Sequence, residues 1–314
     1  MYTKSMRVLI TGAAGFLGSH LVKKFLSENH YVIGLDDFST GNIKNIQSCL
    51  TDSNFKLIEQ DVREKIFLDV DLIMNLACPA SPKAYQSDPV RTIETNFLGI
   101  INLLHLSKLT GATLLQASTS EVYGDPTESP QKESYWGNVN PVGIRSCYDE
   151  GKRAAETLCF DYKRQYGIDS RVVRIFNTYG PNMSVDDGRV VSNFINQAIR
   201  NEPITIYGDG LQTRSFCYVS DLIEGLFDVA MLKTSLETPI NLGNPSEFSI
   251  RELATLILKL TDSSSKVINH ELPLDDPLQR RPDVSKAIEL IGWSPKIDTQ
   301  EGLKKTIDYF REIQ

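Results

Sequence analysis

The stretch RVLITGAAGFLGSH, residues 7–20, decides the fold of this chain. Its first five residues are an apolar run typical of a buried strand, and a helical pattern follows over His20–Ser27. Gly12, Gly15 and Gly18 lie between the two. Glycine lets backbone amides approach a pyrophosphate closely, and a helix N-terminus offers free N–H groups and a favourable dipole. The stretch therefore predicts a strand, a turn and a helix that together hold a phosphate group.

The next predicted strand indicates which phosphate compound this turn holds. The spacing G-x-x-G-x-x-G differs from the usual G-x-G-x-x-G fingerprint, and three glycines alone are also typical of a plain tight turn. The second strand, Tyr31–Leu35, ends in Asp36 and Asp37, about 20 residues further on, where dinucleotide-binding folds place a ribose-binding carboxylate. Both carboxylates would repel a 2′-phosphate, so we expect NAD rather than NADP as the cofactor.

Apolar runs and helical patterns alternate through the first half of the chain. The predicted strands continue with residues 55–59, 71–76, 113–117 and 171–175, and the clearest helices cover residues 89–110 and 149–165. This alternation predicts an α/β fold of the Rossmann type, a doubly wound parallel sheet with helices on both faces. We expect the NAD-binding domain over residues 1–177. A smaller, interleaved C-terminal substrate lobe is expected over residues 178–314, with helices near residues 190–200, 219–232, 250–261 and 301–313, and with some segments returning to the first domain.

Composition excludes several classes of protein. The chain has 314 residues, of which 41% are hydrophobic, and a formal net charge of -7, which argues against a general nucleic-acid or membrane-surface binder. No apolar run approaches a membrane span, and no apolar signal region precedes the first strand. Five cysteines without metal-ligand spacing and only four histidines predict free thiols and no metal site. We therefore expect a cytoplasmic protein.

Tyr148 and Lys152 are the first candidates for chemistry. A separation of four places both side chains on one face of the predicted helix. A packed aromatic ring beside a lysine stem explains the same pair without any chemistry. Next to a nicotinamide, however, the Lys152 ammonium and the cationic ring of NAD⁺ would lower the pKa of the Tyr148 phenol, which could then remove a hydroxyl proton as hydride leaves for the cofactor.

Together these motifs resemble the extended short-chain dehydrogenase/reductase family, whose members modify nucleotide sugars with tightly held NAD. The resemblance covers nearly the whole chain and rests on the glycine spacing, Tyr-x-x-x-Lys, STSEVYG (118–124), RIFNTYGP (174–181) and YGDGLQTRSFCYVSDL (207–222). Within the family, LACPASP (76–82), NPVGIRSCYDEGKR (140–153) and GRVVSNF (188–194) are similar to the UDP-glucuronate decarboxylases. Two positions depart from that group, Ile144 where a proline is common and Glu94 where a lysine is common.

The resemblance implies a complete reaction. The 4-hydroxyl of UDP-glucuronate is oxidised, carbon dioxide leaves the resulting β-keto acid, and hydride returns to give UDP-xylose, so the cofactor is regenerated in each cycle. A 4-epimerase or a 4,6-dehydratase of the same family is the alternative, and a non-catalytic NAD-binding scaffold is a third. Related dehydratases carry an aspartate at the position of Ser120, so the acid for water elimination is missing here.

The resemblance assigns three groups of site residues. The catalytic group is Tyr148, Lys152, Thr119, Ser120, Glu121 and Arg280. The cofactor group comprises, besides Tyr148 and Lys152, Gly12, Gly15, Phe16, Leu17, Gly18, Asp36, Asp37, Asp61, Val62, Leu76, Ala77, Thr178 and Arg189. The substrate group is Pro82, Tyr85, Arg145, Asn177, Val191, Tyr207, Gln212, Arg214 and Arg280.

Some of these assignments keep a structural alternative. Glu121 could be a solvated residue at the end of a strand, and Asn177 could cap a turn. Arg145 could line the sugar pocket, but a salt bridge at its rim is equally compatible with the sequence. By resemblance, Arg214 binds the diphosphate and Arg280 lies near the sugar.

Apolar positions on the helices at residues 89–110 and 149–165 suggest self-association. They include Leu98, Ile101, Leu104, Leu158 and Phe160. In the family that this chain resembles, the equivalent helices pair across a two-fold axis as a four-helix bundle, so we expect a homodimer.

Overall fold

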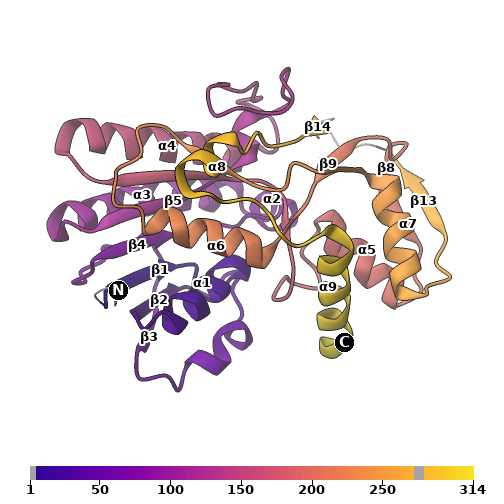
Figure 1. Ribbon diagram of the computed structural model, residues 1–314, viewed down its shortest axis with the longest axis horizontal. Helices are drawn as coiled ribbons and strands as arrows, with labels where there is room; N and C mark the ends of the chain where they lie inside the picture. The colour runs from indigo at the N-terminus through magenta and orange to yellow at the C-terminus, as the bar shows by residue number, and fades with distance from the viewer. Residues whose placement is uncertain (1–4, 272–278) are drawn as a thin grey trace.

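A seven-stranded parallel sheet forms the centre of the molecule. The computed structural model describes residues 5–271 and 279–314 (Figure 1). The strand order across the sheet is β11-β6-β5-β4-β1-β2-β3, and every neighbouring pair is parallel. The strands are β1 (Arg7–Thr11), β2 (Tyr31–Asp36), β3 (Phe55–Glu59), β4 (Leu72–Asn75), β5 (Thr113–Thr119), β6 (Ser170–Ile175) and β11 (Ile240–Leu242). The predicted doubly wound α/β fold is confirmed.

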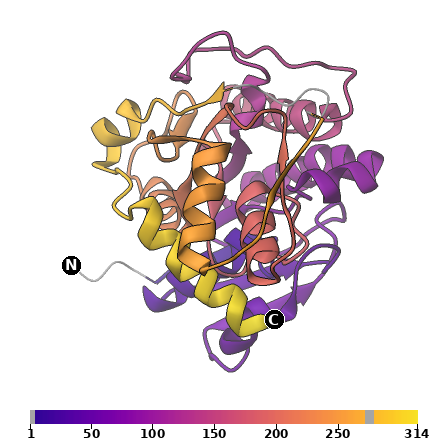
Figure 2. The same ribbon diagram turned by 90° about the vertical axis from the view of Figure 1, so that its right-hand side faces the viewer.

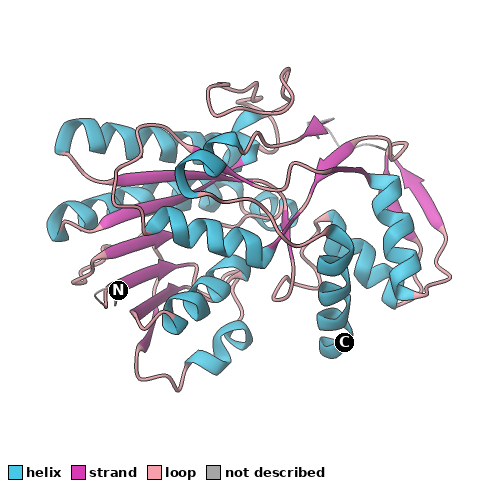
Figure 3. Cartoon of the chain, viewed as in Figure 1, coloured by secondary structure: helices cyan, strands magenta, loops and turns pink. Residues whose placement is uncertain are grey.

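Helices cover both faces of this sheet (Figure 3). Alternate residues of β1 point to opposite faces, so Val8 and Ile10 join one hydrophobic core while Leu9 joins the other. The first core includes residues of α1 (Phe16–Ser27) and α6 (Val219–Ala230). The second includes residues of α3 (Pro89–Thr110) and α4 (Ser146–Tyr166). Because both faces are covered, the strands read as continuous apolar runs in the sequence.

A smaller lobe lies beside the carboxyl ends of the strands (Figures 1 and 2). Its parallel strand pair and three amphipathic helices are β8 (Ile204–Tyr207), β13 (Val267–His270), α5 (Val190–Ile199), α7 (Ile250–Thr261) and α9 (Thr299–Ile313). The shorter elements of the chain are η1 (Ile43–Cys49), α2 (Pro82–Ser87), η2 (Ser120–Tyr123), β7 (Thr178–Tyr179), β9 (Thr213–Ser215), β10 (Cys217–Tyr218), β12 (Glu247–Ser249), β14 (Gln279–Arg280) and α8 (Ser285–Ile291).

The chain beyond Asn177 contributes to both parts of the molecule. Strand β11 pairs with β6 at the edge of the central sheet, and α6 packs against α1. The division of the chain into residues 1–177 and 178–314 stays a prediction, but these two elements are segments that pass back from the lobe to the sheet.

Several boundaries differ from the predictions, and three of the differences concern the site. Helix α1 begins at Phe16 rather than His20, directly after the glycine turn. Helix α4 begins at Ser146 rather than Asp149, so Tyr148 lies in its first turn. Strand β5 extends to Thr119, and Ser120 begins a 3-10 turn. In the described parts of the chain no helix is long and apolar enough to cross a membrane, and all five cysteines are free.

Candidate active site

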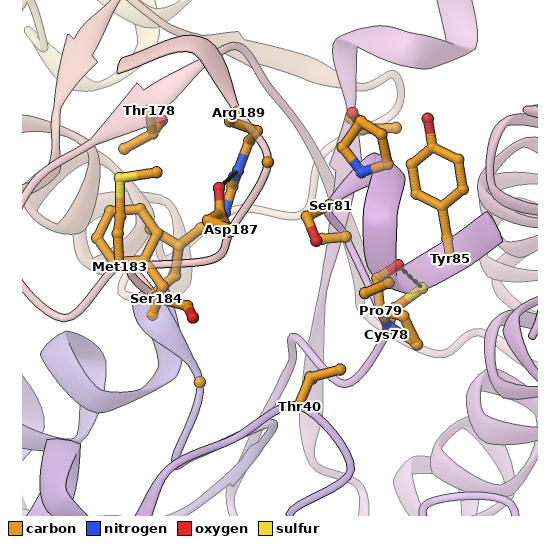
Figure 4. A pocket seen from close by; sticks show the side chains of 18 of the residues that line it. Thr40, Cys78, Pro79, Ser81, Tyr85, Thr178, Met183, Ser184, Asp187 and Arg189 are labelled. Atoms are coloured by element: carbon orange, nitrogen blue, oxygen red, sulfur yellow. Dashed lines mark hydrogen bonds and ion pairs between the residues drawn. The ribbon is translucent and has the colours of Figure 1, made fainter. Parts of the chain in front are cut away.

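A cavity of about 840 Å³ separates the sheet from the lobe. The ends of β1, β2, β4, β5 and β6 contribute its inner wall, where parallel sheets of this kind bind ligands. Figure 4 shows Tyr85, Cys78 and Ser81 on one side of the opening, and Met183, Asp187 and Arg189 on the other. With the exception of Asp61, every residue that the sequence assigned to the site lines this cavity.

The glycine turn leaves room for a phosphate group. Gly12 has a φ of +68°, and a Cβ there would lie 3.0 Å from the carbonyl group of Leu76. A Cβ on Gly18 would lie 2.0 Å from the Gly12 carbonyl oxygen, so this turn tolerates no side chain at that position. No side chain caps the N-terminus of α1. Its free amides face the cavity as the pyrophosphate of NAD requires.

Asp36 and Asp37 occupy different environments at the end of β2. The Asp36 carboxylate accepts hydrogen bonds from the amides of Ala14 (2.8 Å) and Phe38 (2.9 Å). Burial raises the pKa of Asp36 despite these bonds. The Asp37 carboxylate accepts a hydrogen bond from Arg91 (2.6 Å). Because Arg91 offsets the charge of Asp37, the discrimination against a 2′-phosphate rests mainly on Asp36, and the sequence argument that used both carboxylates equally is corrected.

Asp61 lies between two residues that line the cavity, and its assignment to the cofactor stays a prediction. The Asp61 carboxylate is bound by Arg63 (2.8 Å) and contacts Arg91 (3.4 Å), and its side chain is not part of the cavity lining. Burial works against its ionisation, but the hydrogen bonds and charge of Arg63 lower the pKa of Asp61. Arg63 also pairs with Glu94 (2.6 Å), the residue that departs from the related decarboxylases. This departure therefore alters an ion-pair network beside the cofactor end of the cavity and leaves the substrate end unchanged.

Tyr148 and Lys152 both line the cavity and lie close together. Tyr148 is only 6% exposed, and its ring stacks on Tyr85 with the ring centroids 5.1 Å apart. The Lys152 ammonium donates to the Ala117 carbonyl oxygen (2.9 Å) and lies 5.8 Å from the centroid of the Tyr148 ring. The two residues therefore form the expected pair on one face of α4.

Burial dominates the electrostatics of this pair in the protein alone. Burial raises the pKa of Tyr148 although its hydrogen bond with Thr119 acts in the opposite direction. Burial also lowers the pKa of Lys152. For the protein alone, the loss of hydration outweighs the favourable contributions to the phenolate. The expectation that Lys152 and the cationic ring of NAD⁺ together lower the phenol pKa stays a prediction. Stabilisation of the phenolate has to come from charge that a bound ligand brings.

Glu121 is clamped between two arginines. Its carboxylate accepts a hydrogen bond from Arg145 (2.5 Å) and forms an ion pair with Arg280. Arg280 also donates to the Gly124 carbonyl oxygen (2.8 Å) and lies 3.4 Å from the Ser120 hydroxyl. Burial acts to raise the pKa of Glu121, but the charges of Arg280 and Arg145 hold it well below its ordinary value. Glu121 is therefore a half-buried carboxylate held by two ion pairs, and not a solvated residue at the end of a strand.

Segments beyond the central sheet contribute further polar groups to the cavity. Arg214 is 8% exposed and pairs in register with Arg280 where β9 meets β14. Gln212 donates to the Tyr207 carbonyl oxygen (2.6 Å), and both residues line the cavity. Arg189 forms a hydrogen-bonded ion pair with Asp187. Both Arg189 and Arg214 line the cavity, and their assignment to the cofactor and to the diphosphate stays a prediction.

Sequence reasoning missed several residues of the cavity. The loop after β2 contributes Ser39, Thr40 and Asn42, and the segment before α5 contributes Asp187. The polar, glycine-containing sequence STGN (39–42), shortly after Asp37, was an available signal for the first group, because loops at this edge of a parallel sheet face the ligand. In the described residues no cluster of three or more side chains is arranged to hold a metal ion.

Comparison with known proteins agrees with this geometry. Residues 8–243 match the model of the NAD dependent epimerase/dehydratase family. UDP-glucuronic acid decarboxylase 1 of Arabidopsis thaliana is 54% identical over 98% of this chain and 70% of its own length. UDP-glucuronic acid decarboxylase 1 of Xenopus tropicalis is 52% identical over 98% of this chain and 72% of its own.

A solved structure shares both the fold and the kind of ligand that the cavity suits. UDP-glucuronic acid 4-epimerase of Bacillus cereus, in complex with UDP-glucuronic acid and NAD, is 29% identical, with a TM-score of 0.89 over 98% of this chain and all of its own. The glycine turn, the Tyr148–Lys152 pair and this likeness along the whole chain lead to one conclusion. The chain belongs to the NAD dependent epimerase/dehydratase family.

Proposed function

We propose that this protein converts UDP-glucuronate to UDP-xylose and carbon dioxide with NAD as a regenerated cofactor. One observation carries the proposal: Arg280, 2% exposed, and Arg145 converge on Glu121 beside Ser120, at the same end of the cavity as Tyr148. The proposal agrees with the decarboxylase names of the curated relatives, which are 52–54% identical.

The chain's own groups account for the transfer of the 4-hydroxyl proton and for the charge that develops as carbon dioxide leaves. NAD⁺, when bound, accepts a hydride and later returns it. Tyr148 removes the proton of the sugar 4-hydroxyl and gives it back to the 4-oxygen at the end, while Lys152 and Thr119 hold the phenol in place. The 4-ketone lets the C5–C6 bond break, because its electron pair spreads onto the 4-oxygen. Arg280 stabilises the departing carboxylate and the enolate that remains.

The alternative within the family is a 4-epimerase or a 4,6-dehydratase. Ser120 is 2% exposed and bonds with Arg280, so the position that would carry a dehydratase acid holds a hydroxyl group. The solved structure that resembles the chain is a UDP-glucuronic acid 4-epimerase, but it is less similar, at 29% identity. Decarboxylation is therefore the better supported of these reactions, and the 4-epimerase is the competitor to test.

Two further statements belong to the same proposal. The protein is a homodimer that binds no nucleic acid or membrane, and exposed apolar side chains on α3, including Ile93, Phe97 and Leu98, support the association. It is located in the cytoplasm, which five free cysteines favour.

Product analysis tests the function. Purified protein is incubated with UDP-glucuronate, without added NAD or NADH, and the sugar is followed by NMR. We expect UDP-xylose together with carbon dioxide. UDP-galacturonate as the product would make this protein a 4-epimerase, and failure to turn over UDP-glucuronate after reconstitution with NAD would refute the proposal.

A further inference from the structure

A second cavity lies behind the catalytic residues. It has a volume of about 200 Å³, and we call it the rear cavity. Glu121, Arg145 and Arg280 line both this space and the main cavity, so they form the wall between the two. The lining also includes Asp125 and Asp149. A polar space of this size has room for several water molecules.

Asp149 is the unusual group in the rear cavity. It directly follows Tyr148 in the first turn of α4 and is 6% exposed. Its Oδ1 atom is buried and has no hydrogen-bond partner in the protein. A buried carboxylate oxygen without a partner is costly, so native proteins almost always supply one, often a water molecule. The orphaned oxygen and the polar cavity beside it together indicate bound water.

The rear cavity also has a polar, exposed rim. Asp125, Asn138 and Asn140 are exposed residues that contribute to its lining. The space therefore extends from solvent to the inner wall formed by Glu121. No residue of the mechanism described above uses this route.

The proposed reaction needs a proton from solvent. When carbon dioxide leaves, the electron pair of the C5–C6 bond passes to the enolate, and C5 must then gain a proton. Tyr148 cannot supply this proton in the net reaction, because the proton it takes from the 4-hydroxyl returns to the 4-oxygen. The balance is UDP-glucuronate plus one proton giving UDP-xylose plus carbon dioxide. A proton must therefore enter the site in each turnover.

Glu121 is unsuited to store that proton. The guanidinium groups of Arg145 and Arg280 keep its pKa well below neutral, so it rests as a carboxylate. Asp149 has the opposite environment. Burial and the charge of Glu121 raise the pKa of Asp149 to about 7, although Arg145 and Arg280 act to lower it. The charged or titratable groups that face Asp149 are Glu121, Arg145, Arg280, Glu150 and Tyr85.

We propose that the rear cavity conducts the solvent proton to C5 of the sugar and that Asp149 carries it. This inference rests on the proposed function. Asp149 takes a proton from water at the rim and passes it through cavity water to Glu121. Glu121 transfers the proton that it receives to C5 of the sugar, so it is a carboxylate both before and after the transfer. One O–H bond of the relay breaks, one C–H bond forms at C5, and the enolate supplies the electron pair. Asp149 is a relay residue and does not touch the substrate.

The test replaces Asp149 by the isosteric but non-titrating asparagine. In the holoenzyme Asp149→Asn should lower kcat for UDP-xylose at least about tenfold, because a relayed proton transfer is lost, and should leave KM for UDP-glucuronate unchanged. Oxidation of the sugar should still occur, so absorbance at 340 nm should show NADH accumulating during turnover. Imidazole, small enough for the rear cavity, should restore part of the rate.

The pH profile provides a second readout. Asp149 must be protonated to donate, so the wild-type kcat should fall as the pH rises through about 7, and in Asp149→Asn this limb should disappear. Asp161→Asn is the matched control, because Asp161 is an exposed aspartate further along α4, pairs with Arg164 and is not part of the rear-cavity lining. This control should keep the wild-type rate and pH limb, and thermal melting verifies that both variants fold.

Two outcomes would overturn the relay while leaving the decarboxylase intact. In the first, Asp149→Asn keeps more than half of the wild-type kcat and the same pH limb. In the second, kcat falls without NADH accumulation, which shows that Asp149 only positions Tyr148 for the oxidation step. Failure of the proposed function is distinguishable from both, since the wild-type protein would then form no UDP-xylose.

Discussion

Burial has two opposing effects on Tyr148: it fixes the position of the phenol, and it disfavours the phenolate that the reaction needs. Stacking on Tyr85 and burial fix its oxygen beside Thr119, but the same burial raises its pKa and keeps it protonated in the protein alone. A base of this kind acts only when ligands complete its environment, which ties proton removal to the presence of the cofactor. The buried Lys152 is held by the Ala117 carbonyl group and so keeps a fixed place beside the ring.

Tyr148→Phe tests this assignment directly. The variant keeps the ring and its stacking on Tyr85 but has no ionisable oxygen. Turnover of UDP-glucuronate should fall by a factor of roughly 10²–10⁴, while UDP binding measured by calorimetry should stay the same. A variant that keeps more than half of the wild-type turnover would show that another group is the base.

Arg280 and Arg281 offer a matched pair for the decarboxylation step. Arg280 is 2% exposed and bonds with Glu121, whereas Arg281 has a side chain 43% exposed and contacts Glu247 at 3.6 Å. Arg280→Ala should slow carbon dioxide release by about 10² or more and weaken UDP binding far less, because it removes charge stabilisation at the reacting carboxylate. Arg281→Ala should change neither. Equal effects of the two substitutions would contradict the role given to Arg280.

The sequence predicted those site residues whose spacing is itself a signal. Tyr148 and Lys152 follow helical spacing, and Asp36 follows a strand at the expected distance from the glycine turn. The clamp on Glu121 has no such signal, since Arg145 is 24 residues from Glu121 and Arg280 is 160 residues from Ser120. Contacts between residues so far apart in the sequence depend on how the C-terminal segments pack against the sheet. Local sequence patterns do not show this packing.

At the scale of elements, the bounds of α3 and α7 were predicted to the residue, whereas α4 begins three residues earlier than predicted and several short elements were missed. Helix α3 begins after Asp88, which caps it, and ends before Gly111 in a left-handed conformation. Helix α7 has a capping box formed by Ser249 and Glu252. Helix α1 lacks a side-chain cap, so nothing in the sequence marked its start at Phe16. Because no side chain caps the N-terminus of α1, its backbone N–H groups stay available for a phosphate group.

The outer face of α3 makes the oligomeric state testable. Val90, Ile93, Phe97 and Leu98 are each 42–65% exposed, while Leu104, expected to contribute to the dimer, is fully buried in its own protomer's core. Leu104 is thus removed from the proposed interface. Light scattering at micromolar concentration should give about 70 kDa, twice the 35.2 kDa of one chain.

A substitution on this face should separate the protomers. Phe97→Glu places a charge in the apolar stripe and should shift the scattering mass towards that of one chain. Val142→Glu is the control, because Val142 is 89% exposed on a loop outside α3 and α4. A wild-type mass of one chain, or a Phe97→Glu variant that stays dimeric, would rule out this interface.

At the scale of the whole molecule, the two parts share the work of the site. The sheet and its covering helices contribute the glycine turn, Asp36 and the Tyr148–Lys152 pair of α4. The segments of the chain beyond Asn177 contribute Arg189, Arg214 and Arg280. Because the cavity lies between them, one space holds the nucleotide cofactor, the sugar and the diphosphate. In the proposed reaction, one hydride leaves C4 and returns to it within this space, and carbon dioxide is lost in between.

A doubly labelled substrate tests that claim most directly. UDP-glucuronate carrying ¹³C in its carboxyl group and deuterium at C4 is incubated with the purified protein, and the products are followed by NMR. We predict that ¹³C leaves as carbon dioxide while the deuterium remains at C4 of UDP-xylose, because the cofactor returns the hydride that it took. Retention of ¹³C in a UDP-sugar product, or loss of the deuterium from the UDP-xylose formed, would contradict the account.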